Sequence, residues 1–199
     1  MQDRFLTRYM RTLQSVVTSC EVTDERGTPV ELDAAVREAG RQMKGAHRAG
    51  NRLFFIGNGG SAGIASHMAA DFSKNGHMRA SALTDASAIT CLANDFGYEH
   101  VFARQLEWQA RAGDILVAIS SSGRSANILN GVRAARTAGC KAFTLSGFGA
   151  DNPLRQTGDL NFYLASGEYG FVEIGHLALL HGVLDMEMGL QLRRVSTAA

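Results

Sequence analysis

The stretch from Arg52 to Asp71, RLFFIGNGGSAGIASHMAAD, carries the strongest fold signal in this chain. It opens with an apolar run from Leu53 to Ile56 that has the length of a buried β-strand. The glycines that follow permit positive φ angles and a tight turn. Ser61 is then a candidate N-cap for a helix that continues to Asp71. A strand, a glycine turn and a helix N-terminus predict an α/β fold in which backbone N–H groups can hold an anion.

Two side chains that could do chemistry follow the turn. His67 and Asp71 stand four residues apart on the predicted helix, so they share a face. The turn sequence Gly57-Asn58-Gly59-Gly60-Ser61 matches neither a Walker A motif nor a dinucleotide fingerprint. A simple turn without a ligand, and a packed or surface role for His67, therefore stay open as alternatives.

Composition limits the class of protein. The 199 residues are 45% hydrophobic and 20% charged, which predicts one globular domain over residues 1–199. A net charge of +1 without charge blocks indicates that neither nucleic acid nor membrane is a partner. No signal-type apolar core follows the N-terminus, and no run has the length of a membrane span. Cys20, Cys91 and Cys140 form no C-x-x-C motif, so we expect reduced thiols in a cytoplasmic protein.

The N-terminal quarter has helical apolar spacing in two places. Residues 2–20 and 32–49 each repeat apolar side chains every three or four positions. The segment from Val22 to Val30 contains Gly27 and Pro29 and is predicted to be a loop. The two apolar faces need a partner, which could be each other or another subunit.

Strands and helices alternate through the rest of the chain. Strands are expected at 80–84, 114–119, 141–145 and 160–164, and helices at 101–111, 127–138 and 171–192. Residues 88–93 are apolar and run into a predicted turn at 94–97, and the alternating strand 160–164 is expected at a sheet edge. This order predicts parallel strands with helices on both faces. The loops after Ile56 and Ile119 should then meet at the carboxyl ends of the strands, where such folds bind ligands.

Four hydroxyl groups gather after the strand at 114–119: Ser120, Ser121, Ser122 and Ser125. Hydroxyls beside backbone N–H groups at the start of a helix suit a phosphate monoester. No lysine lies in the cluster, so a phosphorylated small metabolite fits better than nucleotide triphosphate chemistry. The alternative is a serine-rich N-cap.

The last predicted helix contains Glu173, His176 and His181. Glu173 and His176 are three residues apart and share a face, whereas His176 and His181 diverge by about 140°. Each of them alone could equally be a surface or core polar residue. Proximity to His67 and Asp71 would change that interpretation.

These motifs, in this order, resemble the sugar-isomerase (SIS) domain family over roughly residues 32–190. They are Gly57-Asn58-Gly59-Gly60-Ser61, His67 with an acid four residues later, Asn94-Asp95-Phe96-Gly97, Ser120-x-Ser122-Gly123-x-Ser125 and His176-x4-His181. The closest resemblance is to the branch of the family that isomerises phosphorylated heptoses. It implies a flavodoxin-like, three-layer αβα sandwich with a five-stranded parallel sheet. It also implies a homotetramer with active sites at subunit contacts, in which residues 1–50 serve oligomerisation.

The resemblance also implies a reaction and a set of site residues. The reaction is conversion of sedoheptulose 7-phosphate to D-glycero-D-manno-heptose 7-phosphate through an enediol, for lipopolysaccharide or capsule biosynthesis. The four serines would bind the phosphate, and the acid–base pair would be Asp71 and His181, in either order. One zinc ion per subunit would be held by His67, Asp71, Glu173 and His181. The sugar would contact Asn58, Gly59, Gly60, Ser61, Asp71, Asn94, Asp95 and Glu173.

Two positions depart from the usual family pattern. Asp71 stands where the family usually has glutamate, and Glu173 stands where it usually has glutamine. Glu173 and His181 are also about 12 Å apart along one helix, so one ion reaches both only with extended side chains, a distorted helix or a neighbouring subunit. A non-catalytic SIS protein that binds a phosphosugar or a partner protein is the alternative function. An isomerase of a different sugar phosphate is a third.

Overall fold

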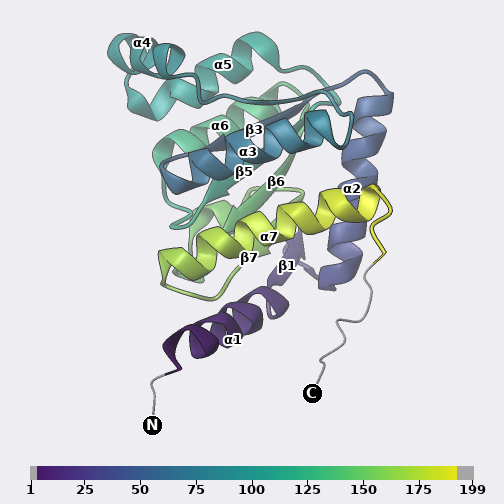
Figure 1. The fold of residues 1–199 in the computed structure, drawn as a ribbon. Helices are drawn as coiled ribbons and strands as arrows, with labels where there is room; N and C mark the ends of the chain where they lie inside the picture. The colour runs from purple at the N-terminus through teal and green to yellow at the C-terminus, as the bar shows by residue number, and fades with distance from the viewer. Residues whose placement is uncertain (1–3, 192–199) are drawn as a thin grey trace.

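The computed structural model describes residues 4–191, which form one seven-stranded sheet between layers of helices (Figure 1). The strands are β1 Glu21–Asp24, β2 Pro29–Val30, β3 Leu53–Gly57, β4 Ala80–Ala82, β5 Ile115–Ser120, β6 Lys141–Ser146 and β7 Leu160–Tyr163. The α-helices are α1 Phe5–Thr18, α2 Leu32–Arg48, α3 Gly60–Lys74, α4 Ala86–Phe96, α5 Val101–Gln109, α6 Ala126–Thr137 and α7 Tyr169–Glu187. Two short 3₁₀ helices are η1 Tyr98–His100 and η2 Pro153–Gln156. The predicted ends of the first and last helices, at residues 2 and 192, lie outside the described residues.

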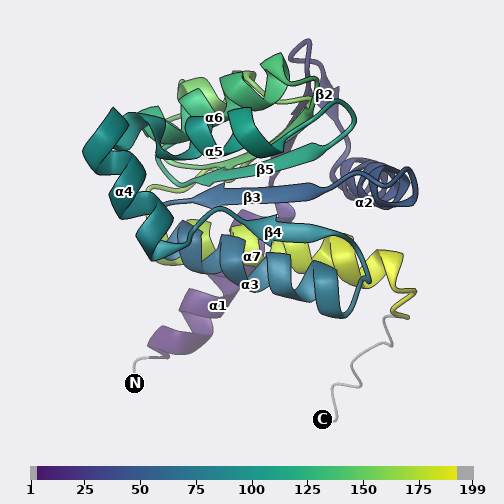
Figure 2. The same ribbon diagram turned by 90° about the horizontal axis from the view of Figure 1, so that it is seen from above.

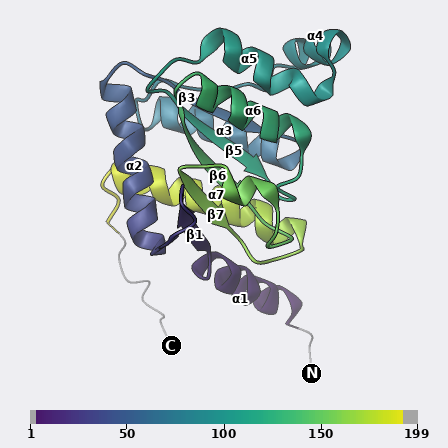
Figure 3. The same ribbon diagram turned by 180° about the vertical axis from the view of Figure 1, so that it is seen from behind.

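The parallel part of the sheet has the predicted architecture. Its five strands lie in the order β4-β3-β5-β6-β7, and each neighbouring pair is parallel. Helices α3 and α7 cover one face, and α5 and α6 cover the other (Figures 2 and 3). The strand order reverses between β3 and β5, and the crevice at such a switch point is where open α/β sheets bind ligands. The three-layer, flavodoxin-like sandwich is therefore confirmed.

The sheet has two strands more than expected, because the predicted loop at 22–30 is a β-hairpin. β1 pairs antiparallel with β2 and also with β7. The Asp24 carboxylate accepts the backbone N–H groups of Arg26 and Thr28 at 2.9 and 2.8 Å, which closes the turn. Pro29 is tolerated because β2 is the outermost strand. The prediction that residues 160–164 form an edge strand was consequently wrong.

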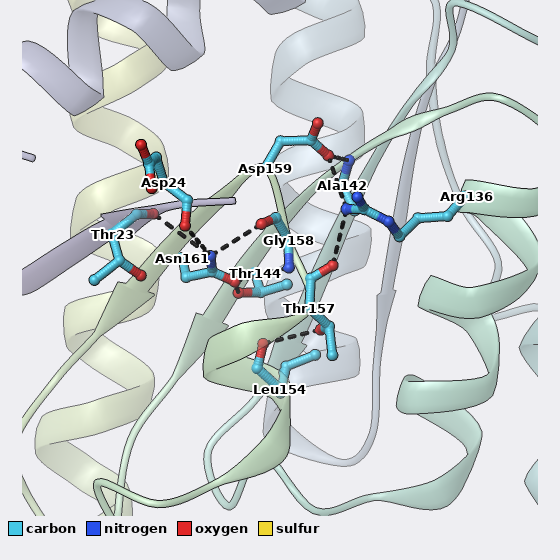
Figure 4. Close-up of polar contacts among 10 residues, drawn as sticks. All are labelled: Thr23, Asp24, Arg136, Ala142, Thr144, Leu154, Thr157, Gly158, Asp159 and Asn161. Carbon is cyan, nitrogen blue, oxygen red and sulfur yellow. Dashed lines mark hydrogen bonds and ion pairs between the residues drawn. The ribbon is translucent and has the colours of Figure 1, made fainter. Parts of the chain in front are cut away.

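A buried polar network joins this hairpin to the sheet (Figure 4). The side-chain oxygen of Asn161, on β7, accepts the Thr144 hydroxyl and the Gly158 backbone N–H, each at 2.8 Å. Its amide nitrogen donates to the carbonyl oxygens of Thr23 and Asp24, each at 3.4 Å. The polar residue that suggested an exposed strand face is therefore buried and satisfied within the sheet.

Two local predictions near the sheet's carboxyl edge were also wrong. The expected turn at 94–97 is the last turn of α4, which ends at Gly97 with φ of 87°. Ser61 is not the N-cap of α3, because the helix starts at Gly60 and Gly59 takes the cap position with φ of 51°. A Cβ atom at Gly57 would lie only 2.4 Å from the carbonyl oxygen of Ser61. The turn is thus so tight that the helix begins before the serine.

The core lies in two layers, one on each side of the sheet. Phe55 packs with Phe72 and Met68 toward α3 and α7, and Phe54 packs with Phe102 toward α5 and α6. Every residue of β3 and β5 is buried, as expected for central parallel strands. This packing fixes the helices from which the candidate site projects.

The N-terminal helices pack mainly on α7, which was not among the predicted partners. α2 and α1 both lie against α7, and the Tyr9 ring contacts the Phe171 ring at a centroid distance of 4.6 Å. The outer face of α1 leaves the apolar side chains of Phe5, Leu6 and Met10 exposed. Within residues 4–191, none of the helices is both long and apolar enough to cross a membrane.

Candidate active site

The loops after β3 and β5 meet at one pocket of about 250 Å³, as the sequence predicted. Its lining is made mostly of glycine backbone, amide and hydroxyl groups, together with one carboxylate. The lining residues are Asn58, Gly59, Gly60, Ser61, Ile119, Ser120, Ser121, Ser122, Ser125, Tyr169 and Glu173. Nine of the predicted substrate-binding residues therefore share one cavity.

The serine loop is preorganised around the start of α6. The Ser120 hydroxyl accepts the backbone N–H of Gly123 at 3.2 Å and lies 3.4 Å from the Ser125 hydroxyl. The Ser121 hydroxyl is buried and has no hydrogen-bond partner among the described residues. Buried hydroxyls are normally paired, and the N-terminus of α6 has a positive field. An anionic oxygen in the pocket would accept a hydrogen bond from the Ser121 hydroxyl and would be stabilised by the field of α6.

An amide pair that the sequence analysis missed ties the two loops together. Asn58 and Asn127 exchange two side-chain hydrogen bonds of 2.9 Å each. The Tyr98 hydroxyl also donates to the Asn58 side-chain oxygen at 3.0 Å. Asn127 is the second residue of α6, just after the serines, but nothing in its local sequence shows that it faces another loop.

Glu173 lines the same pocket and lies against the glycine turn that follows β3. A Cβ atom at Gly60 would be 2.5 Å from both carboxylate oxygens of Glu173. Only glycine lets this carboxylate approach the first residue of α3, where the helix dipole favours negative charge.

Three of the four predicted metal ligands come together about two helical turns beyond Gly60, the first residue of α3. His67 and Asp71 belong to α3 and His181 belongs to α7, which packs against α3. The Nε2 atoms of the two histidines are 3.3 Å apart, and His67 Nε2 is 3.4 Å from an Asp71 carboxylate oxygen. Glu173 is not part of this cluster within the chain. The reason is the helix rise, which separates it from His181 by about 12 Å.

The spacing of the three side chains can be compared with the ligand spacing around a zinc ion. Two ligand atoms at about 2.1 Å from a tetrahedral zinc ion lie about 3.4 Å from each other. The separations of 3.3 and 3.4 Å from His67 Nε2 to its two neighbours match that spacing, and all three ligand atoms lie within 4.8 Å of one another. Three protein ligands would leave a fourth position open, as in catalytic zinc sites.

Asn94 and Asp95 do not reach the pocket of their own chain. Both are exposed near the end of α4, and the Asn94 amide donates to the Asp95 carboxylate at 2.9 Å. Figure 2 shows α4 extending beyond the sheet at the end toward which β3 points.

His176 belongs to the core rather than to the site. It is fully buried, and its Nε2 lies 3.1 Å from the Ser146 carbonyl oxygen, which requires an Nε2–H donor. Its Nδ1 has no partner among the described residues. Burial lowers the pKa of His176 to about 4, so this histidine is neutral near pH 7.

Comparison with known proteins agrees with this arrangement. Residues 27–147 match the SIS domain family model. A phosphoheptose isomerase of Bradyrhizobium sp. (strain ORS 278) is 41% identical over 162 residues, which cover 77% of this chain and 80% of the relative. The phosphoheptose isomerase of Geobacter sp. (strain M21) is 34% identical over 78% of this chain and 84% of its own length. The chain belongs to the phosphoheptose isomerases of the SIS domain family.

A solved structure extends the similarity to the family's fold. The phosphoheptose isomerase of Neisseria gonorrhoeae superimposes with a TM-score of 0.79 and 29% identity, covering 95% of this chain and 99% of that one. At 95% of this chain, the match extends well beyond residues 27–147, which the family model covers. Both the serine pocket and the cluster of His67, Asp71 and His181 therefore lie on a phosphoheptose isomerase scaffold.

Proposed function

We propose that this protein isomerises sedoheptulose 7-phosphate to D-glycero-D-manno-heptose 7-phosphate. The observation that carries the proposal is a pair of sites, one at the loops after β3 and β5 and the other between α3 and α7. One is a hydroxyl-rich pocket with an unpartnered buried Ser121 hydroxyl. The other is the cluster of two imidazoles and a carboxylate. The names of the curated relatives give the same activity.

The spacing of the two sites supports a long sugar chain. His67 lies seven residues after Gly60, which is about 10 Å along the helix. From C2 to the phosphorus of a heptose 7-phosphate there are seven bonds of about 1.5 Å, which span roughly 9 Å when extended. The phosphate could then occupy the serine pocket while the reacting carbons lie near the cluster.

The reaction moves one proton between neighbouring carbons through an enediol. A base must remove the C–H proton, and an acid must protonate the adjacent oxygen. We assign these roles to Asp71 and His181, in either order, while the serine loop holds the phosphate in place. His67, Asp71 and His181 would hold one zinc ion, which when bound supplies positive charge for the developing oxyanion. The acid–base and ligand roles compete for His181 Nε2, so activity and metal content must be measured together.

The direct test offers the protein five-, six- and seven-carbon ketose phosphates and identifies the products by NMR. Each sugar is tested with chelator-treated enzyme and again after zinc is restored. We expect turnover of the seven-carbon substrate and its loss on metal removal. Turnover of a shorter sugar alone would reassign the substrate. No turnover of any sugar under either condition would contradict the proposed activity and favour a binding protein.

The serine loop gives a second prediction. Replacing Ser122 and Ser125 together with alanine should raise KM for the sugar phosphate several-fold, because two hydroxyls that line the pocket are lost. Steady-state kinetics measures this directly. Ser87→Ala, an exposed serine on α4, is the matched control. An unchanged KM in the double variant would refute the phosphate assignment.

We further propose that the 199 residues form a single SIS domain that assembles as a homotetramer through residues 1–50. The exposed apolar side chains of Phe5, Leu6 and Met10 on α1 support this. Subunit contacts would also give Asn94 and Asp95 a route to a neighbour's sugar. Light scattering should report about four times the 21.3 kDa chain mass, and a monomer at micromolar concentration would contradict the proposal.

The cellular role is proposed from the family resemblance. It is a cytoplasmic enzyme for lipopolysaccharide or capsule biosynthesis, with neither nucleic acid nor membrane as a partner. Loss of the gene should remove heptose from the surface polysaccharide, and an unchanged polysaccharide would contradict this role.

A further inference from the structure

Tyr169 is an aromatic residue of the pocket lining that none of the roles above uses. It is the first residue of α7 and lines the pocket together with Glu173, which is one turn later on the same helix face. The residue remains 62% exposed, so its side chain is accessible to a bound ligand. Ile119 is the other apolar side chain in the lining.

The ring is held in place by Phe148. The two ring centroids are 4.8 Å apart and the rings are inclined at 81°, an edge-to-face contact. Phe148 has a φ of 56°, in a region that bulky residues rarely adopt. Its backbone is fixed there because its N–H donates to Ser166 at 2.9 Å and its carbonyl accepts the Tyr163 hydroxyl at 2.8 Å. Strain of this kind tends to persist where it positions a functional group.

Helix α1 supports the same turn of α7 from another side. The Tyr9 ring packs on Phe171, and a Cβ atom at Gly170 would lie 2.5 Å from the Tyr9 hydroxyl. The residues next to Tyr169 are therefore held by packing, while Tyr169 itself belongs to the pocket lining.

We propose that Tyr169 is a substrate-contacting residue whose ring packs against the C–H groups of the sugar chain. The inference rests on the proposed function and adds a determinant of sugar affinity to it. Hydroxyl and amide groups dominate the pocket, and they can bind the phosphate and sugar hydroxyls. The carbon chain between them needs an apolar contact, which a rigid aromatic ring provides.

The test separates sugar binding from phosphate binding. For each variant we would measure KM and the dissociation constant of sedoheptulose 7-phosphate, and the dissociation constant of inorganic phosphate. Tyr169→Ala should weaken sugar-phosphate binding about tenfold and leave phosphate binding within twofold. Tyr169→Phe keeps the ring and should therefore weaken sugar-phosphate binding much less than Tyr169→Ala does. Phe148→Leu, which removes the supporting edge contact, should give an intermediate effect.

The control is Trp108→Ala, another exposed aromatic residue, on α5 and outside the pocket lining. Unchanged sugar affinity in Tyr169→Ala would overturn the proposal. An equal loss of sugar and phosphate affinity would also overturn it, because the ring would then act on the whole pocket. If the wild type binds sugar phosphates without turning them over, the proposed activity fails while the role of Tyr169 is still read from the dissociation constants.

Discussion

Asp71→Asn is expected to lower kcat for ketose-phosphate isomerisation by roughly 10²–10⁴-fold, the usual worth of general acid–base catalysis. The substitution keeps the size of the side chain and removes its basicity. His181→Gln should have a comparable effect, because the two side chains project into one cluster from α3 and α7. The double variant should lose little more, since groups that act as a unit are not additive. Steady-state kinetics of the three variants provides the measurement.

Metal content distinguishes the two roles proposed for these residues. If Asp71→Asn retains zinc by mass spectrometry and loses turnover, Asp71 acts in proton transfer. If zinc and turnover are lost together, its main role is to hold the ion. Full activity in Asp71→Asn would refute both assignments. Asp71→Glu restores the residue usual in the family, and it should keep activity if aspartate is merely tolerated and lose activity if the shorter side chain is matched to its site.

The second large effect concerns stability in acid, through His176. Its pKa is about 4 in the folded protein and 6.5 in the unfolded chain, so between these values the unfolded state binds more protons. The contribution of His176 to the free energy of unfolding is therefore fully present above pH 6.5, and it is lost as the pH falls toward 4. At pH 4.5 the loss should be roughly 2–3 kcal/mol relative to pH 8.

Urea unfolding at pH 8 and pH 4.5, at one protein concentration, measures this loss. In His176→Gln the stability difference between the two pH values should shrink by about the same amount, roughly 2–3 kcal/mol. Any constant folding penalty cancels, because each variant is compared with itself. His100→Gln, a histidine of the η1 turn, is the control. An unchanged pH difference in His176→Gln would show that the buried imidazole does not drive the acid sensitivity.

Local chemistry made the α/β core and the two ligand loops predictable. The apolar runs that form β3 and β5 are buried on both faces, so they stand out without any tertiary information. Glycine is needed where a Cβ atom would collide with the next turn, as at Gly57. Because parallel strands end at one edge, both loops were expected at one pocket, and they line it.

Contacts between distant segments settled what local patterns left ambiguous. The hairpin of β1 and β2 contains Pro29 and Gly27, and it is a pair of strands only because β7 supplies the hydrogen-bonding edge. Tyr98 and Asn127 belong to the pocket's framework only because both meet Asn58, which is 40 and 69 residues away.

The division of the four proposed metal ligands is the clearest such case. Their residue types and spacing suggested that all four bind one zinc ion. Spacing along one helix, however, fixes only how far apart two side chains lie along the axis and in which direction each leaves it. The parallel packing of α3 on α7 brings His181 to His67 and Asp71, and it brings Glu173 to Gly60. Which residues share a site was therefore decided by how the two helices align, a non-local property that no single stretch of sequence encodes.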